Sequence, residues 1–254
     1  MSKLIRIFIV LMMALSVPMS TAFAHNDHDD RGKDSVVALG DSVPFGYSPY
    51  SNNERPAKYA YPYLIGDKAD LKVTNLAVPG WQTDDLLAAL ETNKKFRKAV
   101  KRADYVTVQI GGNDFLEVLR AAYAESQGNN ELFHKLLQQK LASSDAFADL
   151  SQIIGEIRSL TNAKIVLYNL YNPFQVNDPF HHVANLYLPQ LNAVYKGLAD
   201  SDKNVKLADT YNAFGDNQAK YVFPGDIHPT KAGHVKLAKI GLRALSRDYA
   251  HHRN

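Results

Sequence analysis

Five short apolar runs alternate along the chain with longer segments in which apolar residues recur at helical spacing. Runs of this length that are rich in Val, Ile and Leu and bounded by turn residues are typical of central parallel strands. The first three runs stop at Gly40, at Pro79-Gly80 and at Gly111-Gly112. The pattern predicts five strands, at residues 35–39, 71–78, 105–110, 164–170 and 205–208.

The segments between the runs predict helices. Thr83 is suited to cap one helix, Thr230 is suited to cap the last one, and residues 145–160 repeat apolar positions at helical spacing. Alternating strands and helices predict an α/β fold, with a mostly parallel five-stranded sheet covered by helices on both faces. Neither an internal repeat nor a linker interrupts residues 35–250, which predicts one domain there. The apolar face expected for the last helix comprises Val235, Ala238, Leu242 and Leu245.

The first 24 residues have the pattern of a cleaved signal peptide. Lys3 and Arg6 precede an apolar run at residues 7–17, and Ala22-Phe23-Ala24 then matches an A-x-A cleavage site. The run is too short to span about 30 Å of hydrocarbon, which takes about 20 residues. We therefore expect a secreted protein without stable membrane insertion, beginning with a polar tail at residues 25–34.

Composition narrows the functional classes. The 254 residues include no cysteine, and 46% are hydrophobic and 22% charged, which is typical of a soluble globular protein. Removal of Lys3 and Arg6 would leave a net charge near +1 from the formal +3, and no basic stripe supports nucleic-acid binding. Motifs for zinc proteases, P-loop enzymes and dinucleotide-binding enzymes are also missing, so we expect neither a metal nor a cofactor.

Chemically useful residues follow four of the predicted strands. In an open parallel sheet, ligands bind beyond the carboxyl ends of the strands, so residues that follow different strands meet there. A serine, a glycine, an asparagine and a histidine are thereby brought to one edge. They belong to the segments Gly40-Asp41-Ser42, Pro79-Gly80, Gly111-Gly112-Asn113-Asp114 and Gly225-Asp226-Ile227-His228-Pro229.

These residue types are the ones needed for acyl transfer to a serine. Ser42 becomes a nucleophile when a base takes its proton, and His228 is suited to that task near neutral pH. The tetrahedral intermediate needs hydrogen-bond donors at its oxyanion. Backbone N–H groups of Ser42 and Gly80 and the side-chain amide of Asn113 can supply them.

The pattern resembles the GDSL/SGNH hydrolase family over almost the whole chain after residue 24. Gly40-Asp41-Ser42 followed by Gly46 matches the family's G-D-S-x-x-x-G, and the blocks containing Gly80, Asn113 and His228-Pro229 follow in the family's order. The resemblance implies a flavodoxin-like, three-layer α/β/α sandwich. It also implies Ser42 as nucleophile, Gly80 and Asn113 as further oxyanion donors, and His228 as base.

One departure from the family concerns the acid that orients the base. The family's last block is usually D-x-x-H, but Gly225 occupies the acid's position here and Asp226 lies only two residues before His228. Three interpretations remain open. Asp226 reaches the imidazole through a changed turn, the Gly225 carbonyl orients the ring, or a distant acid such as Asp178 does so. We expect Asp226.

Other interpretations compete for several of these residues. Ser42 and Asn113 could each cap a helix, and Gly80 after Pro79 could serve only a type II turn. His234 is expected to be structural, and no constellation is visible around His134, His181 and His182.

The leading functional hypothesis is a secreted carboxylic ester hydrolase that acts on lipid-like or small acyl esters. The alternatives are a polysaccharide O-acetyl esterase, whose substrate would be a glycan ester, and a non-catalytic binding protein on the same fold. Acyl length, alcohol portion and oligomeric state are left open by the sequence.

Overall fold

The computed structural model describes the backbone of residues 32–249 and the side chains of residues 32–245. The predicted signal peptide at residues 1–24 and the first seven residues of the predicted tail, 25–31, lie outside the described residues. No helix of the described part is both long and apolar enough to cross a membrane.

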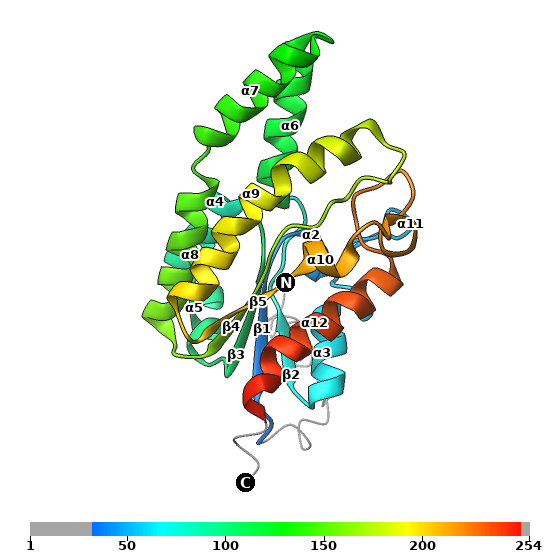
Figure 1. Cartoon of the computed structure of the whole chain (residues 1–254). Coiled ribbons are helices and arrows are strands. Elements are labelled where there is room, and N and C mark those ends of the chain that lie inside the picture. Colours follow the sequence, from blue (N-terminus) through cyan, green and yellow to red (C-terminus); the bar gives the residue numbers. More distant parts are fainter. Residues whose placement is uncertain (1–31, 250–254) are drawn as a thin grey trace, which may run out of the picture. The chain divides into compact units, whose positions relative to one another are not determined.

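Five parallel strands form one sheet in the order β2-β1-β3-β4-β5 (Figure 1). This order is that of flavodoxin-like doubly wound folds, so the predicted fold class is confirmed. The second strand ends three residues earlier than predicted, although the N–H groups of Leu76 and Val78 still donate to the Ala38 and Gly40 carbonyls of β1. The strands are β1 (Ser35–Gly40), β2 (Lys72–Asn75), β3 (Tyr105–Gln109), β4 (Lys164–Tyr168) and β5 (Val205–Ala208).

Helices cover both faces of the sheet because side chains of a strand alternate between its faces. Val37 and Leu39 of β1 pack into one core cluster, whereas Val36 packs into the other. The larger cluster lies under α4 (Thr83–Thr92), α5 (Lys94–Lys101), α8 (Ala146–Leu160) and α9 (Pro179–Ser201). The smaller lies under α3 (Tyr61–Ala69) and α12 (Lys231–Tyr249), near the short helices α10 (Thr210–Phe214) and α11 (Gln218–Tyr221).

Helices α6 (Gly112–Ser126) and α7 (Asn130–Ala142) form a hairpin beyond the carboxyl ends of the strands (Figure 1). Aromatic contacts join the hairpin to the first turn of α9, where the Phe180 ring lies 5.2 Å from that of Tyr123 and 6.5 Å from that of Phe133. These contacts hold the far end of the hairpin, while the start of α6 follows β3 closely and so lies at the edge of the sheet where the functional residues were expected.

Two helix predictions need correction. Thr83 is the first residue of α4 rather than its cap, because its hydroxyl donates to Asp114 Oδ1 at 2.6 Å and Gln82 occupies the cap position. Thr230 does cap α12, accepting from Gly233 N–H at 3.1 Å. Of the core face predicted for α12, Ala238 and Leu245 are buried, whereas Val235 is 59% exposed and its neighbour His234 is fully buried instead.

Candidate active site

Ser42 follows β1 directly and begins the one-turn helix α2 (Ser42–Phe45). Gly40 has a φ of +139°, and a Cβ there would lie 1.9 Å from the Gln109 carbonyl oxygen of β3, so only glycine fits before the turn. Asp41 caps α2 by accepting from Val43 N–H at 2.9 Å. The cap is thus Asp41, and the capping role considered for Ser42 is wrong.

The side chains of Ser42, His228 and Asp226 form a continuous hydrogen-bonded chain. Ser42 Oγ lies 2.9 Å from His228 Nε2, and His228 Nδ1 lies 2.6 Å from Asp226 Oδ1. A carboxylate can only accept, so the Nδ1–H donates to Asp226 and Nε2 is left to accept from the Ser42 hydroxyl. In this geometry His228 Nε2 can take the proton of the Ser42 hydroxyl while the Asp226 carboxylate holds the ring in place.

A tight turn explains how an acid two residues before the histidine reaches its ring. Pro224 and Gly225 occupy the two central positions of a turn in which Asp226 N–H donates to the Phe223 carbonyl at 3.1 Å, with Gly225 at φ +70°. Asp226 Oδ1 then accepts from His228 N–H at 2.8 Å as well as from the ring.

The other two groups considered for this position are not at the ring. The group bonded to His228 Nδ1 is the Asp226 carboxylate rather than the Gly225 carbonyl. Asp178 instead caps α9, where its carboxylate accepts from Phe180 N–H at 2.8 Å.

Burial keeps His228 ready to act as a base. Loss of solvent lowers the pKa of its imidazole, and the hydrogen bond and charge of Asp226 offset this only in part. The ring also packs against Tyr47, with centroids 4.4 Å apart. At neutral pH the imidazole is therefore neutral and Nε2 can take a proton.

Three possible oxyanion donors differ in how they are held. Asn113 lies in the first turn of α6, whose cap is Gly111, so the capping role considered for Asn113 is wrong. One of its amide hydrogens donates to the Trp81 carbonyl at 2.8 Å, which leaves the second available. Within residues 32–249, neither the Ser42 N–H nor the Gly80 N–H has a hydrogen-bond acceptor.

Gly80 occupies a type II turn, as one interpretation of the sequence had it. Its φ is +86°, and Trp81 N–H closes the turn on the Val78 carbonyl at 3.3 Å. Asn113 lines the pocket that contains Ser42 and His228, whereas Gly80 is not among the residues lining it. Of the predicted donors beyond Ser42, Asn113 is therefore the one best placed.

Comparison with known proteins agrees with this geometry. A model of the GDSL-like lipase/acylhydrolase family matches residues 38–236. The chain belongs to this family. The match confirms the expected family, and its lipase and esterase members support ester hydrolysis as the general activity of this GDSL-like chain.

Individual relatives extend the family likeness along the chain. YpmR of Bacillus subtilis (strain 168) is 28% identical over 95% of this chain and 94% of its own length. The spore germination lipase LipC of Bacillus licheniformis is 30% identical over 64% of this chain and 73% of its own. The crystal structure of the lipase Lip_vut3 from a goat rumen metagenome superposes with a TM-score of 0.64 at 25% identity, covering 84% of this chain and 98% of that one.

An apolar pocket adjoins Ser42 in this GDSL-like protein. It encloses about 530 Å³ of empty space, its open mouth included. Ser42, His228 and Asn113 lie on its wall, and the remaining lining is largely hydrophobic. Its apolar lining comes from Ile110, Phe115, Leu116, Leu170, Leu188 and neighbouring residues.

Two carboxyl groups beside the site, the buried Asp41 and the half-buried Asp114, were assigned no role from the sequence. Burial raises the pKa of Asp41 to about 7, and the nearby charge of Asp114 adds to the increase. Burial also raises the pKa of Asp114, whose carboxylate accepts from both the N–H and the hydroxyl of Thr83. Asp114 thereby ties the start of α6 to the start of α4, and with it the adjoining Gly80 turn.

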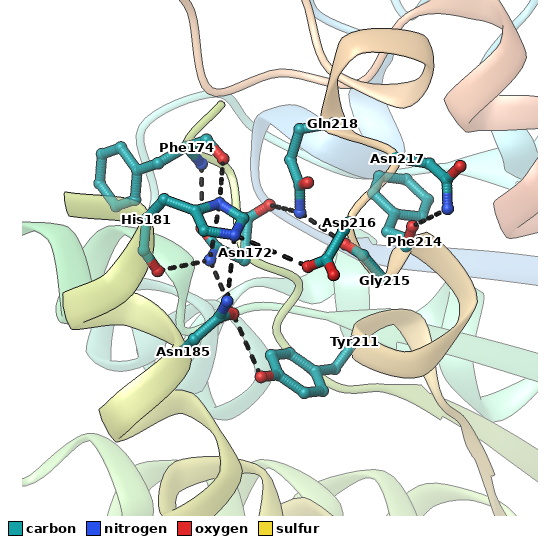
Figure 2. A network of polar contacts seen from close by, with 10 residues as sticks. All are labelled: Asn172, Phe174, His181, Asn185, Tyr211, Phe214, Gly215, Asp216, Asn217 and Gln218. Carbon is teal, nitrogen blue, oxygen red and sulfur yellow. Dashed lines mark hydrogen bonds and ion pairs between the residues drawn. The ribbon is translucent and has the colours of Figure 1, made fainter. Parts of the chain in front are cut away.

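His181 belongs to a polar network that sequence reasoning missed (Figure 2). Its Nδ1 lies 2.8 Å from the Phe174 carbonyl oxygen, and its Nε2 lies 3.0 Å from Asn185 Nδ2. Asn172 Nδ2 donates to the Asn185 side chain, and Tyr211 OH donates to the same oxygen. The network links the loop after β4 to α9 and α10, and no local sequence motif predicts it.

The other histidines divide into structural and peripheral ones. His234 is fully buried, and its Nδ1 accepts from Tyr61 N–H at 3.3 Å, which agrees with the structural role expected. His134 Nδ1 lies 3.0 Å from Tyr187 OH on α9. Among the described residues, no three His, Asp or Glu side chains are grouped as a metal site would need.

Proposed function

We propose that this protein is a secreted serine carboxylic ester hydrolase that works through an acyl-enzyme on Ser42. The observation that carries the proposal is the hydrogen-bonded chain from Ser42 Oγ through His228 to Asp226, at 2.9 and 2.6 Å. Distances in this range are what a nucleophile and its base require.

Acylation begins when Ser42 Oγ attacks the ester carbonyl carbon and His228 Nε2 takes the hydroxyl proton. The carbonyl oxygen becomes an oxyanion, for which the Ser42 and Gly80 N–H groups and the free hydrogen of Asn113 Nδ2 are donors. Asp226 holds the ring with Nε2 toward Ser42 and stabilises the imidazolium. Collapse of the intermediate breaks the ester C–O bond, and His228 returns the proton to the departing alcohol.

Deacylation repeats these steps with water as the nucleophile. His228 Nε2 takes a proton from water as its oxygen attacks the acyl carbon on Ser42. Collapse then breaks the bond between that carbon and Ser42 Oγ, which recovers the proton from His228. The products are a carboxylic acid and the free enzyme, and no metal takes part in any step.

The apolar wall of the pocket favours esters whose acyl part is a hydrocarbon chain. Ser42, Asn113 and His228 are among the polar residues of the lining, and hydrocarbon side chains supply most of the remainder. An acetylated glycan would place only a methyl group there. Paired assays on medium-chain nitrophenyl esters and on acetylated xylan distinguish these substrates, and we expect the first to be the better one.

Replacement of the nucleophile tests the mechanism. Ser42→Ala should abolish ester turnover and labelling by a fluorophosphonate while the circular dichroism spectrum is kept, because alanine lacks the attacking oxygen. Ser48→Ala is the matched control, since Ser48 is equally buried on the same segment and should leave labelling intact. Labelling that persists in Ser42→Ala would show that another residue is the nucleophile.

Export is tested on the mature amino terminus. Expressed from its own start codon in a Gram-positive host, the protein should be found in the medium beginning at His25, because cleavage is expected after Ala24. Protein that keeps Met1 and stays with the membrane would contradict the proposed secretion.

A further inference from the structure

Two side chains divide the Ser42 pocket from a second cavity. Phe115 and Leu170 line both spaces, and they are only 4% and 8% exposed. The second cavity lies between α6, α8 and α9 and comprises about 360 Å³ of space not occupied by atoms, its open mouth included. Its other apolar lining residues are Val118, Leu141, Ala146, Phe147 and Leu191.

The polar side chains that line the second cavity, Thr83, Asp114, Ser144 and Tyr195, all make hydrogen bonds within the protein. The Thr83 hydroxyl donates to the Asp114 carboxylate at 2.6 Å, Tyr195 OH donates to the Ile110 carbonyl at 2.8 Å, and Ser144 Oγ accepts from Ala146 N–H at 3.3 Å. Because these bonds use the polar atoms internally, the surface left to an occupant is mainly hydrocarbon. A cavity of this kind suits an alkyl chain better than water or a sugar.

Phe115 and Leu170 together form the partition between the two spaces, and the position of Phe115 in the chain places this partition close to the expected ester-binding site. Phe115 lies two residues after Asn113 in the first turn of α6, so the oxyanion donor and the partition are on the same rigid element. An acyl group on Ser42 has its carbonyl oxygen toward Asn113, and its chain extends into the apolar pocket. A chain long enough to fill that pocket next meets Phe115 and Leu170.

We propose that Phe115, together with Leu170, sets the upper limit of acyl chain length by closing the Ser42 pocket against the second cavity. This inference rests on the proposed ester hydrolysis. Removing the Phe115 ring joins the two spaces, and methylene groups beyond the present limit then enter the space freed by the ring and the largely apolar second cavity. Each methylene buried in this way improves binding of the transition state by about fourfold.

The test is an acyl chain-length profile of kcat/KM with nitrophenyl esters from C2 to C14. In Phe115→Ala the optimum should move to longer chains, and the ratio of kcat/KM for an ester four carbons beyond the wild-type optimum to that at the optimum should rise by on the order of 10². Phe115→Val, a milder change, should move the ratio in the same direction by less. An unchanged ratio in both variants overturns the proposal.

Val118→Ala is the matched control because Val118 lines only the second cavity. With the partition in place, enlarging that cavity should leave the profile unchanged, whereas Phe115→Ala/Val118→Ala should accept still longer chains than Phe115→Ala. A shift in Val118→Ala equal to that in Phe115→Ala would overturn the proposal.

Fluorophosphonate titration counts the competent sites in each variant, so misfolded protein does not enter kcat. Wild-type protein that neither hydrolyses any ester nor takes the label would instead overturn the proposed function itself.

Discussion

Two buried side chains, His234 and Asp41, should give the folding free energy opposite dependences on pH. Burial, reinforced by nearby His228, lowers the pKa of His234 to about 3 in the native protein. Burial raises the pKa of Asp41 to about 7. In the unfolded chain these groups titrate near their ordinary values of about 6.5 and about 3.9.

The sign of each effect follows from which state holds the extra proton. Between pH 4 and 6.5 the unfolded chain carries a proton on His234 that the native protein lacks, so this stabilisation is present above pH 6.5 and is lost on acidification. Over the same range native Asp41 holds a proton that the unfolded chain lacks, so its stabilisation is lost as pH rises. Each effect amounts to about 1.4 kcal/mol per pH unit, and the two nearly cancel.

Single substitutions should expose the two opposing terms. His234→Gln keeps an acceptor for Tyr61 N–H and Asp41→Asn keeps one for Val43 N–H, so each removes a titration with little change in hydrogen bonding. Between pH 4.5 and 6.5 the free energy of unfolding of wild type minus that of His234→Gln should rise by about 2 kcal/mol, and the same difference for Asp41→Asn should fall by a similar amount.

Urea denaturation followed by circular dichroism at several pH values measures these differences. A difference cancels every titration that wild type and variant share, so its slope reports the substituted residue alone. If plots of the free energy of unfolding against pH stay parallel for wild type and His234→Gln over this range, the reasoning is refuted. Parallel plots would mean that His234 is protonated equally in the native and unfolded states.

Two further predictions concern the proposed catalytic groups. Asn113→Ala should lower kcat by roughly 10²–10³ with a smaller effect on KM, since the lost hydrogen bond strengthens mainly in the transition state, and steady-state kinetics that leave kcat unchanged would remove Asn113 from the site. Asp226→Asn should lower kcat by up to about 10⁴, because the amide favours the wrong tautomer of His228. It should also move the acidic limb of the pH–rate profile to lower pH, because burial already lowers the pKa of His228 and Asp226 is what raises it. If the acidic limb of the pH–rate profile does not move in Asp226→Asn, Asp226 does not influence the pKa of the His228 ring.

The central strands β1, β3 and β4 could be predicted because they are buried on both faces, whereas the edge strand β2 is only partly buried. Ile165 and Val166 in β4 point to opposite faces and are both completely buried, and such burial forces an unbroken apolar run into the sequence. The face of α12 was harder to predict, because a buried histidine at residue 234 interrupts the apolar pattern and made Val235 look like a core residue.

The position of a site residue was predictable where that residue follows its own strand. It was less predictable where the conformation of a turn determines the direction of the side chain. Ser42 and His228 could be paired because the ends of parallel strands meet at one edge. The identity of the acid that orients His228 depended on the direction that the chain takes after Gly225. This direction is a backbone property that the motif alone does not reveal. The His181 network depends on side chains from three distant elements, so no local pattern marks it.

The Pro224-Gly225 turn has a consequence for how relatives of this protein are recognised. A pattern search that demands aspartate three residues before the histidine would discard this chain, although the carboxylate lies against the ring. Motif spacing therefore describes the geometry only indirectly. A change of turn can bring the acid to the histidine ring even when it lies one residue closer in the sequence. Homologues that read P-G-D-x-H are therefore candidates for the same contact between carboxylate and ring.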